Sequence, residues 1–151
     1  MTEVIRAAAE LQAFCEGERW QYCFIDGLAV LRWGEPRETV DVDLTLLTGF
    51  RNEAAFVSRL LSRYEPRIPD AAAFAQANRV LLQAPSVVGL DIALAGLPFE
   101  TRIIERASEF TFPVDVRLRT CSAEDLVVLK AFADRPDASA TSPKSTTCPA
   151  G

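Results

Sequence analysis

The sequence predicts a single α/β domain in which a mixed β-sheet is flanked by helices, and three observations support this class. The chain has 151 residues, which is enough for one domain of ordinary size. Hydrophobic residues make up 49% of it and charged residues 25%, the balance of a globular protein. Helical and strand periodicities alternate along residues 1–134 in the order α-β-α-β-α-β-β-α-β-α.

The first part of the chain contains two predicted helices and two predicted strands. Residues 2–17 have the 3.6-residue apolar period of a helix. The apolar run 22–25 predicts a short buried strand, and an Asp-Gly turn leads from it into a short helix over 28–33. Residues 40–46 alternate between apolar and polar, with Val40 among the apolar positions, which predicts a strand with one apolar face.

The middle of the chain predicts a helix, two strands and another helix. Residues 52–61 are amphipathic, as a helix on the surface of a domain should be. Residues 79–83 and 89–95 predict strands that are joined through Pro85. Proline at position 98 suits the first turn of a helix that runs to about residue 107.

The last predicted elements are one strand and one helix. Residues 110–118 alternate and predict a single strand, for which Pro113 favours an edge position. Ser122 and Asp125 resemble a capping box that begins a helix over 123–133. Residues 135–151 are small, polar and proline-containing, so we expect a disordered tail after a domain of residues 1–134.

Composition excludes several classes of function. The chain has no histidine, which rules out histidine bases, histidine metal ligands and Ser-His-Asp catalysis. A net charge of −5 does not steer the whole molecule onto nucleic acid. The four cysteines form no C-x-x-C pair, so we expect reduced thiols in a cytoplasmic protein rather than a zinc site. No apolar run approaches the roughly 18 residues of a membrane span, so no membrane partner is expected.

Asp41 and Asp43 are the first candidate site residues. In a strand, residues two apart project from the same face, with Cα atoms about 6.6 Å apart at about 3.3 Å per residue. Two carboxylates at this spacing can hold one divalent cation or share a pair, and Mg²⁺ is the usual choice because it takes oxygen ligands. The alternative is that the pair is solvated surface on an exposed strand face.

Asp91 and Gly27 extend this candidate site. If the strand of Asp91 pairs with the strand of Asp43, three carboxylates meet on one sheet face, where like-charge repulsion requires bound cations. Two metal ions there would activate a nucleophile and stabilise a leaving pyrophosphate. Gly27 lies at a strand-to-helix turn, where backbone amides can approach phosphates. The alternative for Asp91 is an acid at a strand end.

The segment FIDGLAVLRWGEPRETVDVDLTLL resembles the signature of the DNA polymerase β-like nucleotidyltransferase superfamily. Within that superfamily, GLAVLRWGEPR…DVDLTLL and SAEDLVVLKAFADRP resemble the AbiEii-type group, which includes toxins of toxin–antitoxin pairs. The resemblance covers residues 13–136. It implies the nucleotidyltransferase fold and Mg²⁺-dependent transfer of NMP from an NTP, with a two-metal site.

The resemblance also implies roles for individual residues. Asp41 and Asp43 match the metal-binding pair, and Asp91 matches the third metal-binding carboxylate. Gly27 matches the second glycine of the nucleotide-binding turn. Lys130 matches a lysine near the nucleotide phosphates, the alternative being a solvated lysine beside an apolar helix stripe.

Asp26 departs from the pattern, because the superfamily has glycine at the first position of this turn. A carboxylate there would face the triphosphate that the turn should bind. We therefore keep two hypotheses. The first is a nucleotidyltransferase acting on a hydroxyl of an RNA, protein or small-molecule acceptor, with the role of a toxin paired with a cognate antitoxin as one form of this hypothesis. The alternative is a catalytically impaired domain of the same fold that acts by protein binding, with a plain nucleotide-binding regulator as a weaker third.

Overall fold

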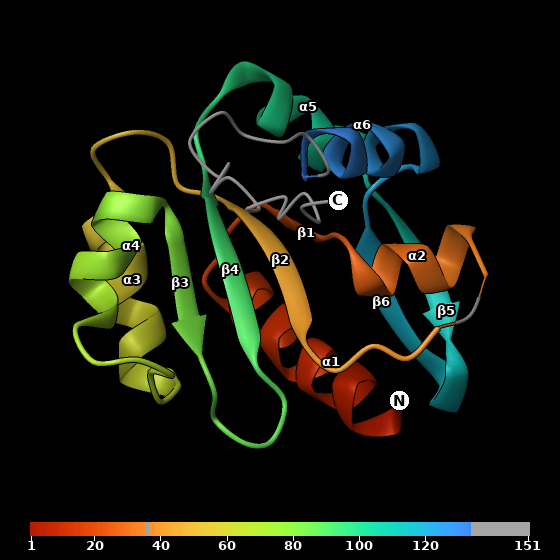
Figure 1. Ribbon diagram of the computed structural model, residues 1–151, viewed down its shortest axis with the longest axis horizontal. Helices are drawn as coiled ribbons and strands as arrows, with labels where there is room; N and C mark the ends of the chain where they lie inside the picture. The colour runs from red at the N-terminus through yellow and green to blue at the C-terminus, as the bar shows by residue number, and fades with distance from the viewer. Residues whose placement is uncertain (36, 134–151) are drawn as a thin grey trace, which may run out of the picture.

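The computed structural model describes residues 1–35 and 37–133, and in this part of the chain six strands form one mixed sheet. The sheet has the order β3-β4-β2-β1-β6-β5 and is flanked by helices (Figure 1). The predicted fold class is confirmed. The tail expected over residues 135–151 lies outside the described residues.

The helices and strands have the following bounds. The strands are β1 (Tyr22–Phe24), β2 (Val42–Leu47), β3 (Val80–Gln83), β4 (Leu90–Ala95), β5 (Ser108–Phe112) and β6 (Val116–Thr120). The helices are α1 (Thr2–Gly17), α2 (Gly27–Trp33), α3 (Glu53–Arg63), α4 (Ala71–Asn78), α5 (Pro98–Arg106) and α6 (Ala123–Ala133). A 3₁₀ turn, η1 (Pro113–Asp115), lies between β5 and β6. Among the described residues, no helix has both the length and the apolar composition that a membrane crossing requires.

The strands pair in both directions. β2 and β4 are parallel, and so are β1 and β6. β1 is antiparallel to β2, β3 to β4, and β5 to β6. The parallel β2–β4 pair needs a long crossover, which α3, α4 and β3 supply. This pairing of β2 with β4 is the one on which the three-carboxylate prediction depended.

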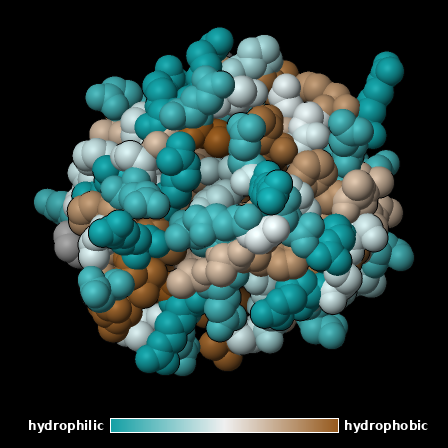
Figure 2. Space-filling model, turned by 180° about the vertical axis from the view of Figure 1, so that it is seen from behind, coloured by the Kyte–Doolittle hydropathy of each residue, from teal (hydrophilic) through white to brown (hydrophobic). Residues whose placement is uncertain are grey.

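Helices cover both faces of the sheet. α1, α3 and α4 pack with Leu44, Leu46 and Ile92 in the larger apolar cluster on one face. α2, α5 and α6 pack around Cys23 and Ala95 in the smaller cluster on the other face. The surface seen from behind is mostly hydrophilic, with separated apolar areas (Figure 2). Both faces of the central strands are therefore buried over much of their length, whereas the edge strand β5 is exposed along most of its residues.

The single strand predicted over residues 110–118 is wrong. The segment forms the hairpin of β5 and β6 around η1. Val114 and Asp115 have positive φ values of 61° and 58°, and they turn the chain after Pro113. Each strand alternates by itself, so the apolar period appeared to continue through the turn. The predicted edge position is confirmed, because β5 is an edge strand of the sheet.

Two other local predictions need correction, and one is confirmed. α4 was not predicted, because its buried residues are only Ala71 and Ala75 and it lacks a wide apolar stripe. β2 begins at Val42, and Val40 is 65% exposed rather than buried. The capping box before α6 is confirmed, since the Asp125 amide donates to the Ser122 hydroxyl at 3.1 Å.

Candidate functional site

Four chain segments meet at one end of the sheet. β1 and β2 are antiparallel, so the end of β1 lies beside the start of β2. Asp26 follows the end of β1, and Asp43 is close to the start of β2. β4 is parallel to β2, so its own start brings Asp91 to the same end. β6 is parallel to β1 and leads into α6, which places Lys130 there as well. The topology therefore brings together residues that are far apart in the sequence.

Asp43 and Asp91 lie directly opposite each other in the register of β2 and β4. Their neighbours Val42, Leu44 and Ile92 point into the α1 side of the sheet, so both carboxylates point to the side of α2, α5 and α6. Asp41 lies one residue before β2, and its Oδ1 accepts a hydrogen bond of 3.1 Å from the Gly89 amide.

Burial and the neighbouring acids disfavour the charged form of Asp43. The pKa of Asp43 is raised from 3.8 to about 7, first by burial and then by the carboxylates of Asp26, Asp91 and Asp41. The Arg67 guanidinium acts in the opposite direction. A divalent cation beside Asp43 would relieve this repulsion, because it would stabilise the ionised carboxylate.

The donor set fits Mg²⁺ held jointly by protein and substrate. Within residues 1–35 and 37–133, no three acidic or cysteine side chains form a ready-made metal cage. Mg²⁺ is usually held by only one or two carboxylates together with substrate phosphates. Asp43 and Asp91, on neighbouring strands, are two carboxylates that could hold such an ion.

Asp26 occupies a turn position that suits glycine. Its φ and ψ are 51° and −121°, a region that L side chains rarely adopt. Its carboxylate lies 3.7 Å from Arg37 Nη2 and 3.9 Å from Lys130 Nζ, and 54% of the side chain is exposed. The side chain makes no capping hydrogen bond to α2 in the described structure. The residue that departs from the motif thus pairs with two cations at the site.

Gly27 is required at its position by Thr39, a contact that sequence reasoning missed. A Cβ on Gly27 would lie 2.5 Å from Thr39 Cγ2 and 2.9 Å from Thr39 Oγ1. Thr39 is buried, and among the described residues its hydroxyl has no hydrogen-bond partner. The glycine therefore allows the start of α2 to pack against the segment that leads into β2, besides any role toward phosphates.

Two pockets adjoin at Asp26 and Arg37. One, of about 280 Å³, extends from them past Gly27 to Asp41 and Asp43. The other, of about 430 Å³, extends to Lys130 and has apolar walls of Ile25, Leu126, Leu129 and Ala133. A larger apolar pocket of about 590 Å³ lies elsewhere, against β5. Both of the first two pockets contain acidic and cationic side chains, Asp26 and Arg37 among them.

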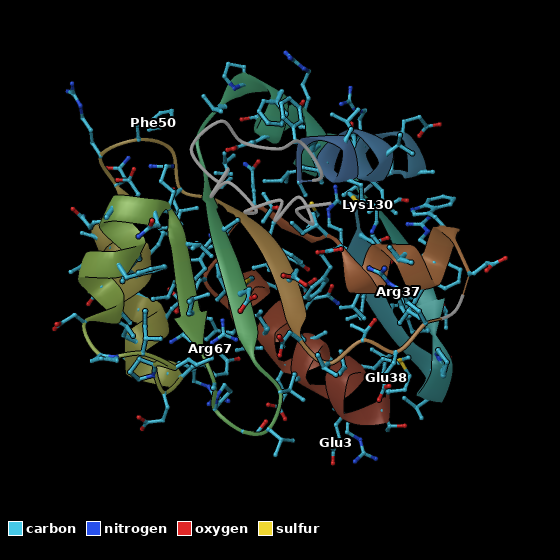
Figure 3. All side chains as sticks on the ribbon, in the orientation of Figure 1. Glu3, Arg37, Glu38, Phe50, Arg67 and Lys130 are labelled. Atoms are coloured by element: carbon cyan, nitrogen blue, oxygen red, sulfur yellow. The ribbon has the colours of Figure 1, made fainter. Side chains whose placement is uncertain are left out.

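Arg67 is a site residue that sequence reasoning missed. It lies in the loop after α3, and its Nη2 contacts Asp91 Oδ1 at 2.5 Å. Figure 3 places Arg67 on the β3 side of the sheet and Arg37 and Lys130 on the side of α2 and α6. No periodicity or motif distinguishes this arginine in the sequence, because its contact with Asp91 exists only in the folded chain.

Comparison with known proteins finds similarity in structure but not in sequence. No protein-family model matches the sequence, and no curated protein matches it significantly. Solved structures do match. The lincosamide antibiotic adenylyltransferase LnuA, bound to lincomycin, has a TM-score of 0.55 at 15% identity, covering 83% of this chain and 84% of that chain. An antigenic nucleotidyltransferase-like protein from Paracoccidioides brasiliensis has a TM-score of 0.58 at 15% identity, covering 92% and 71%.

The chain has the nucleotidyltransferase fold. This confirms the resemblance at the level of the fold, and membership of the AbiEii-type group stays a prediction. In this nucleotidyltransferase fold, the sequence-predicted residues Asp43, Asp91 and Lys130 come to one end of the sheet. Asp41 and Gly27 line the pocket beside them.

Proposed function

We propose that this chain is a metal-dependent nucleotidyltransferase that moves an NMP from an NTP to a hydroxyl group. The observation that supports this most is the pairing of Asp43 with Asp91 across parallel strands, beside the turn at Asp26 and Gly27. Two paired carboxylates on a sheet face, next to cationic side chains and a pocket, suit a triphosphate with its cations.

Asp41 and Asp43 would hold Mg²⁺, with Asp91 as the third carboxylate. Bound Mg²⁺ would neutralise charge on the phosphates and favour ionisation of the attacking hydroxyl. Asp91 would orient the acceptor and take its proton, while the acceptor oxygen attacks the α-phosphorus and pyrophosphate leaves. Gly27 and its neighbouring amides would hold the β- and γ-phosphates, and Lys130 would pair with phosphate oxygens.

For the acceptor, we propose a small molecule with a free hydroxyl group. LnuA is a lincosamide adenylyltransferase, and the match covers most of both chains. The pocket of about 430 Å³ beside Asp26 has the apolar walls that a small molecule needs. RNA or protein acceptors, and a toxin role with an antitoxin partner, remain the other outcomes of the same screen.

The test is incubation of the full chain with each labelled NTP, Mg²⁺ and three acceptor pools: small hydroxylated compounds, total RNA and total protein. We expect label transfer that requires Mg²⁺ and is abolished by the double substitution Asp41→Asn and Asp43→Asn. Asp115→Asn, an exposed acid in η1, is the matched control. Transfer that survives in the double variant would contradict the proposal.

One observation favours a second candidate, a domain that has lost catalysis and binds a protein partner. The Asp26 carboxylate lies beside both Arg37 and Lys130, the cations that a triphosphate would need. Thermal unfolding with and without Mg²⁺-NTP distinguishes the two candidates, because a ligand that binds only the folded state raises the Tm. A Tm that no Mg²⁺-NTP raises would favour the protein-binding domain.

A further inference from the structure

The backbone of Arg67 is held beside the strand residue that faces Asp91. The segment before α4 pairs with the end of β3: the Arg67 amide donates to the Leu82 carbonyl at 3.1 Å, and the Ala84 amide donates to the Glu65 carbonyl at 3.0 Å. Leu82 is the partner of Asp91 in the β3–β4 register. The backbone of Arg67 is therefore fixed near Asp91, and the arginine side chain is long enough to bring its guanidinium to that carboxylate.

The guanidinium reaches across the acid cluster. Its Nη2 contacts Asp91 Oδ1 at 2.5 Å, and the two side chains are 31% and 30% exposed. A Cβ on Gly89 would lie 2.5 Å from Arg67 Nη1 and 2.7 Å from Asp41 Oδ1. Nη1 and the Asp41 carboxylate thus share the space above Gly89. Arg67 lies between two of the three carboxylates that the proposed function assigns to metal ions.

A guanidinium and a divalent cation compete for such a position. Both need the lone pairs of the same carboxylate oxygens, and their positive charges repel each other at contact distance. Arg37 and Lys130 do not raise this conflict, because both pair with Asp26 on the other side of the site.

We propose that Arg67 is a positioning residue that takes the place of the second divalent cation at Asp91, and that it must leave Asp91 before this cation binds. The proposal rests on the proposed function, since it presumes a two-cation site. Without nucleotide, the guanidinium satisfies Asp91 and keeps the second cation weakly bound. The triphosphate brings new anionic oxygens to the site, and these favour release of Arg67 from Asp91.

The test is a titration of the nucleotide-free full chain with Mn²⁺, following the electron paramagnetic resonance signal of free Mn²⁺. Arg67→Gln removes the competing charge, and we expect it to tighten the weaker Mn²⁺ site by about fivefold or more. Arg67→Met, a second neutral variant, should give the same change, and Arg67→Lys should restore weak binding. These shifts report on the competing charge, because a merely structural role of Arg67 would not tighten a cation site.

Arg59→Gln is the matched control. Arg59 of α3 also pairs with an acid, Glu18 near the end of α1, but on the opposite face of the sheet from Asp91. Its removal lowers the net charge equally and should leave both Mn²⁺ affinities unchanged.

The outcomes separate this proposal from the proposed function. If the wild type binds Mn²⁺ and Arg67→Gln binds it with equal or lower affinity, the role of Arg67 is overturned. The nucleotidyltransferase proposal is unaffected by that result. Tighter binding in Arg67→Gln, together with no NMP transfer to any acceptor, supports Arg67 and overturns the proposed activity. Absence of Mn²⁺ binding to every nucleotide-free variant overturns the role of Arg67, and absence of binding in the presence of NTP as well overturns both proposals.

Discussion

Replacement of Asp43 by asparagine should stabilise the metal-free protein above neutral pH. The pKa of Asp43 is about 7 in the folded chain, against an ordinary value of 3.8, first because of burial and then because of the carboxylates of Asp26, Asp91 and Asp41. Between these two pH values the folded state retains a proton that the unfolded state has released. The free energy of unfolding therefore falls as pH rises from about 4 to about 7, and the loss is complete above that range.

The size of this effect follows from the same two pKa values. At about 1.4 kcal/mol for each pH unit between them, the whole difference corresponds to about 4 kcal/mol. Partial exposure of the carboxylate and screening by solvent reduce this to about 1–2 kcal/mol. An asparagine at position 43 has no charge to bury, so the variant should gain that amount at pH 8 and little at pH 4.5.

The assay is urea unfolding of the wild type, Asp43→Asn and Asp115→Asn in EDTA, at pH 4.5 and pH 8. Asp115 is an exposed acid, and its replacement should leave the pH dependence unchanged. Adding NTP and an excess of Mg²⁺ over EDTA at pH 8 should then stabilise the wild type and not Asp43→Asn, because only the wild type retains the proposed Mg²⁺-binding carboxylate. A variant that is less stable than the wild type at pH 8, or a difference that does not change with pH, would refute the reasoning.

Three further predictions concern other parts of the molecule. Asp26→Gly should lower the Kd for Mg²⁺-NTP by about threefold or more, since it removes a negative charge from the proposed anion site. Isothermal titration measures this Kd. Comparison with Asp26→Asn, which removes only the charge, separates the effect of charge from that of backbone strain. Gly27→Ala should lower the free energy of unfolding in urea by about 1–3 kcal/mol because of the clash with Thr39, and by less in a Thr39→Ala background. An equal loss in both backgrounds would contradict the packing role of Gly27. Burial raises the pKa of the Cys15 thiol to about 12 and of the Cys121 thiol to about 11, and also raises that of Cys23. In a Cys148→Ser variant, these thiols should therefore react with a disulfide reagent only on unfolding, and rapid labelling of the native chain would contradict this.

Strand alternation predicted individual strands but not how they pair. The regular polar-apolar pattern predicted the strands of Asp43 and Asp91, whereas their parallel pairing, which the sequence left as a condition, is seen only in the structure. Alternation could not reveal the turn between β5 and β6, because Val114 continues the apolar period while its φ of 61° reverses the chain. The apolar-polar pattern shows which side chains alternate between the two faces, and a turn that keeps the same period cannot be detected from it.

The candidate site was predicted only as far as its motif residues. The sequence left the meeting of Asp43 and Asp91 conditional on the pairing of their two strands, and the structure shows that pairing. Arg67 could not be found in this way, because its contact with Asp91 depends on how the loop after α3 pairs with β3. The packing reason for Gly27 was also missed, since it depends on the folded position of Thr39.

The central position of β1 affects how the chain can fold. β1 lies near the start of the sequence, yet one of its two neighbours in the sheet, β6, ends at Thr120. Pairing between segments so far apart has to overcome a large loop-closure entropy, which slows folding compared with a helical bundle of the same length. A chain that has not yet added β6 also lacks α6, and with it Lys130 beside Asp26. Binding of the proposed nucleotide during refolding should therefore appear with the final sheet contacts rather than with early helix formation.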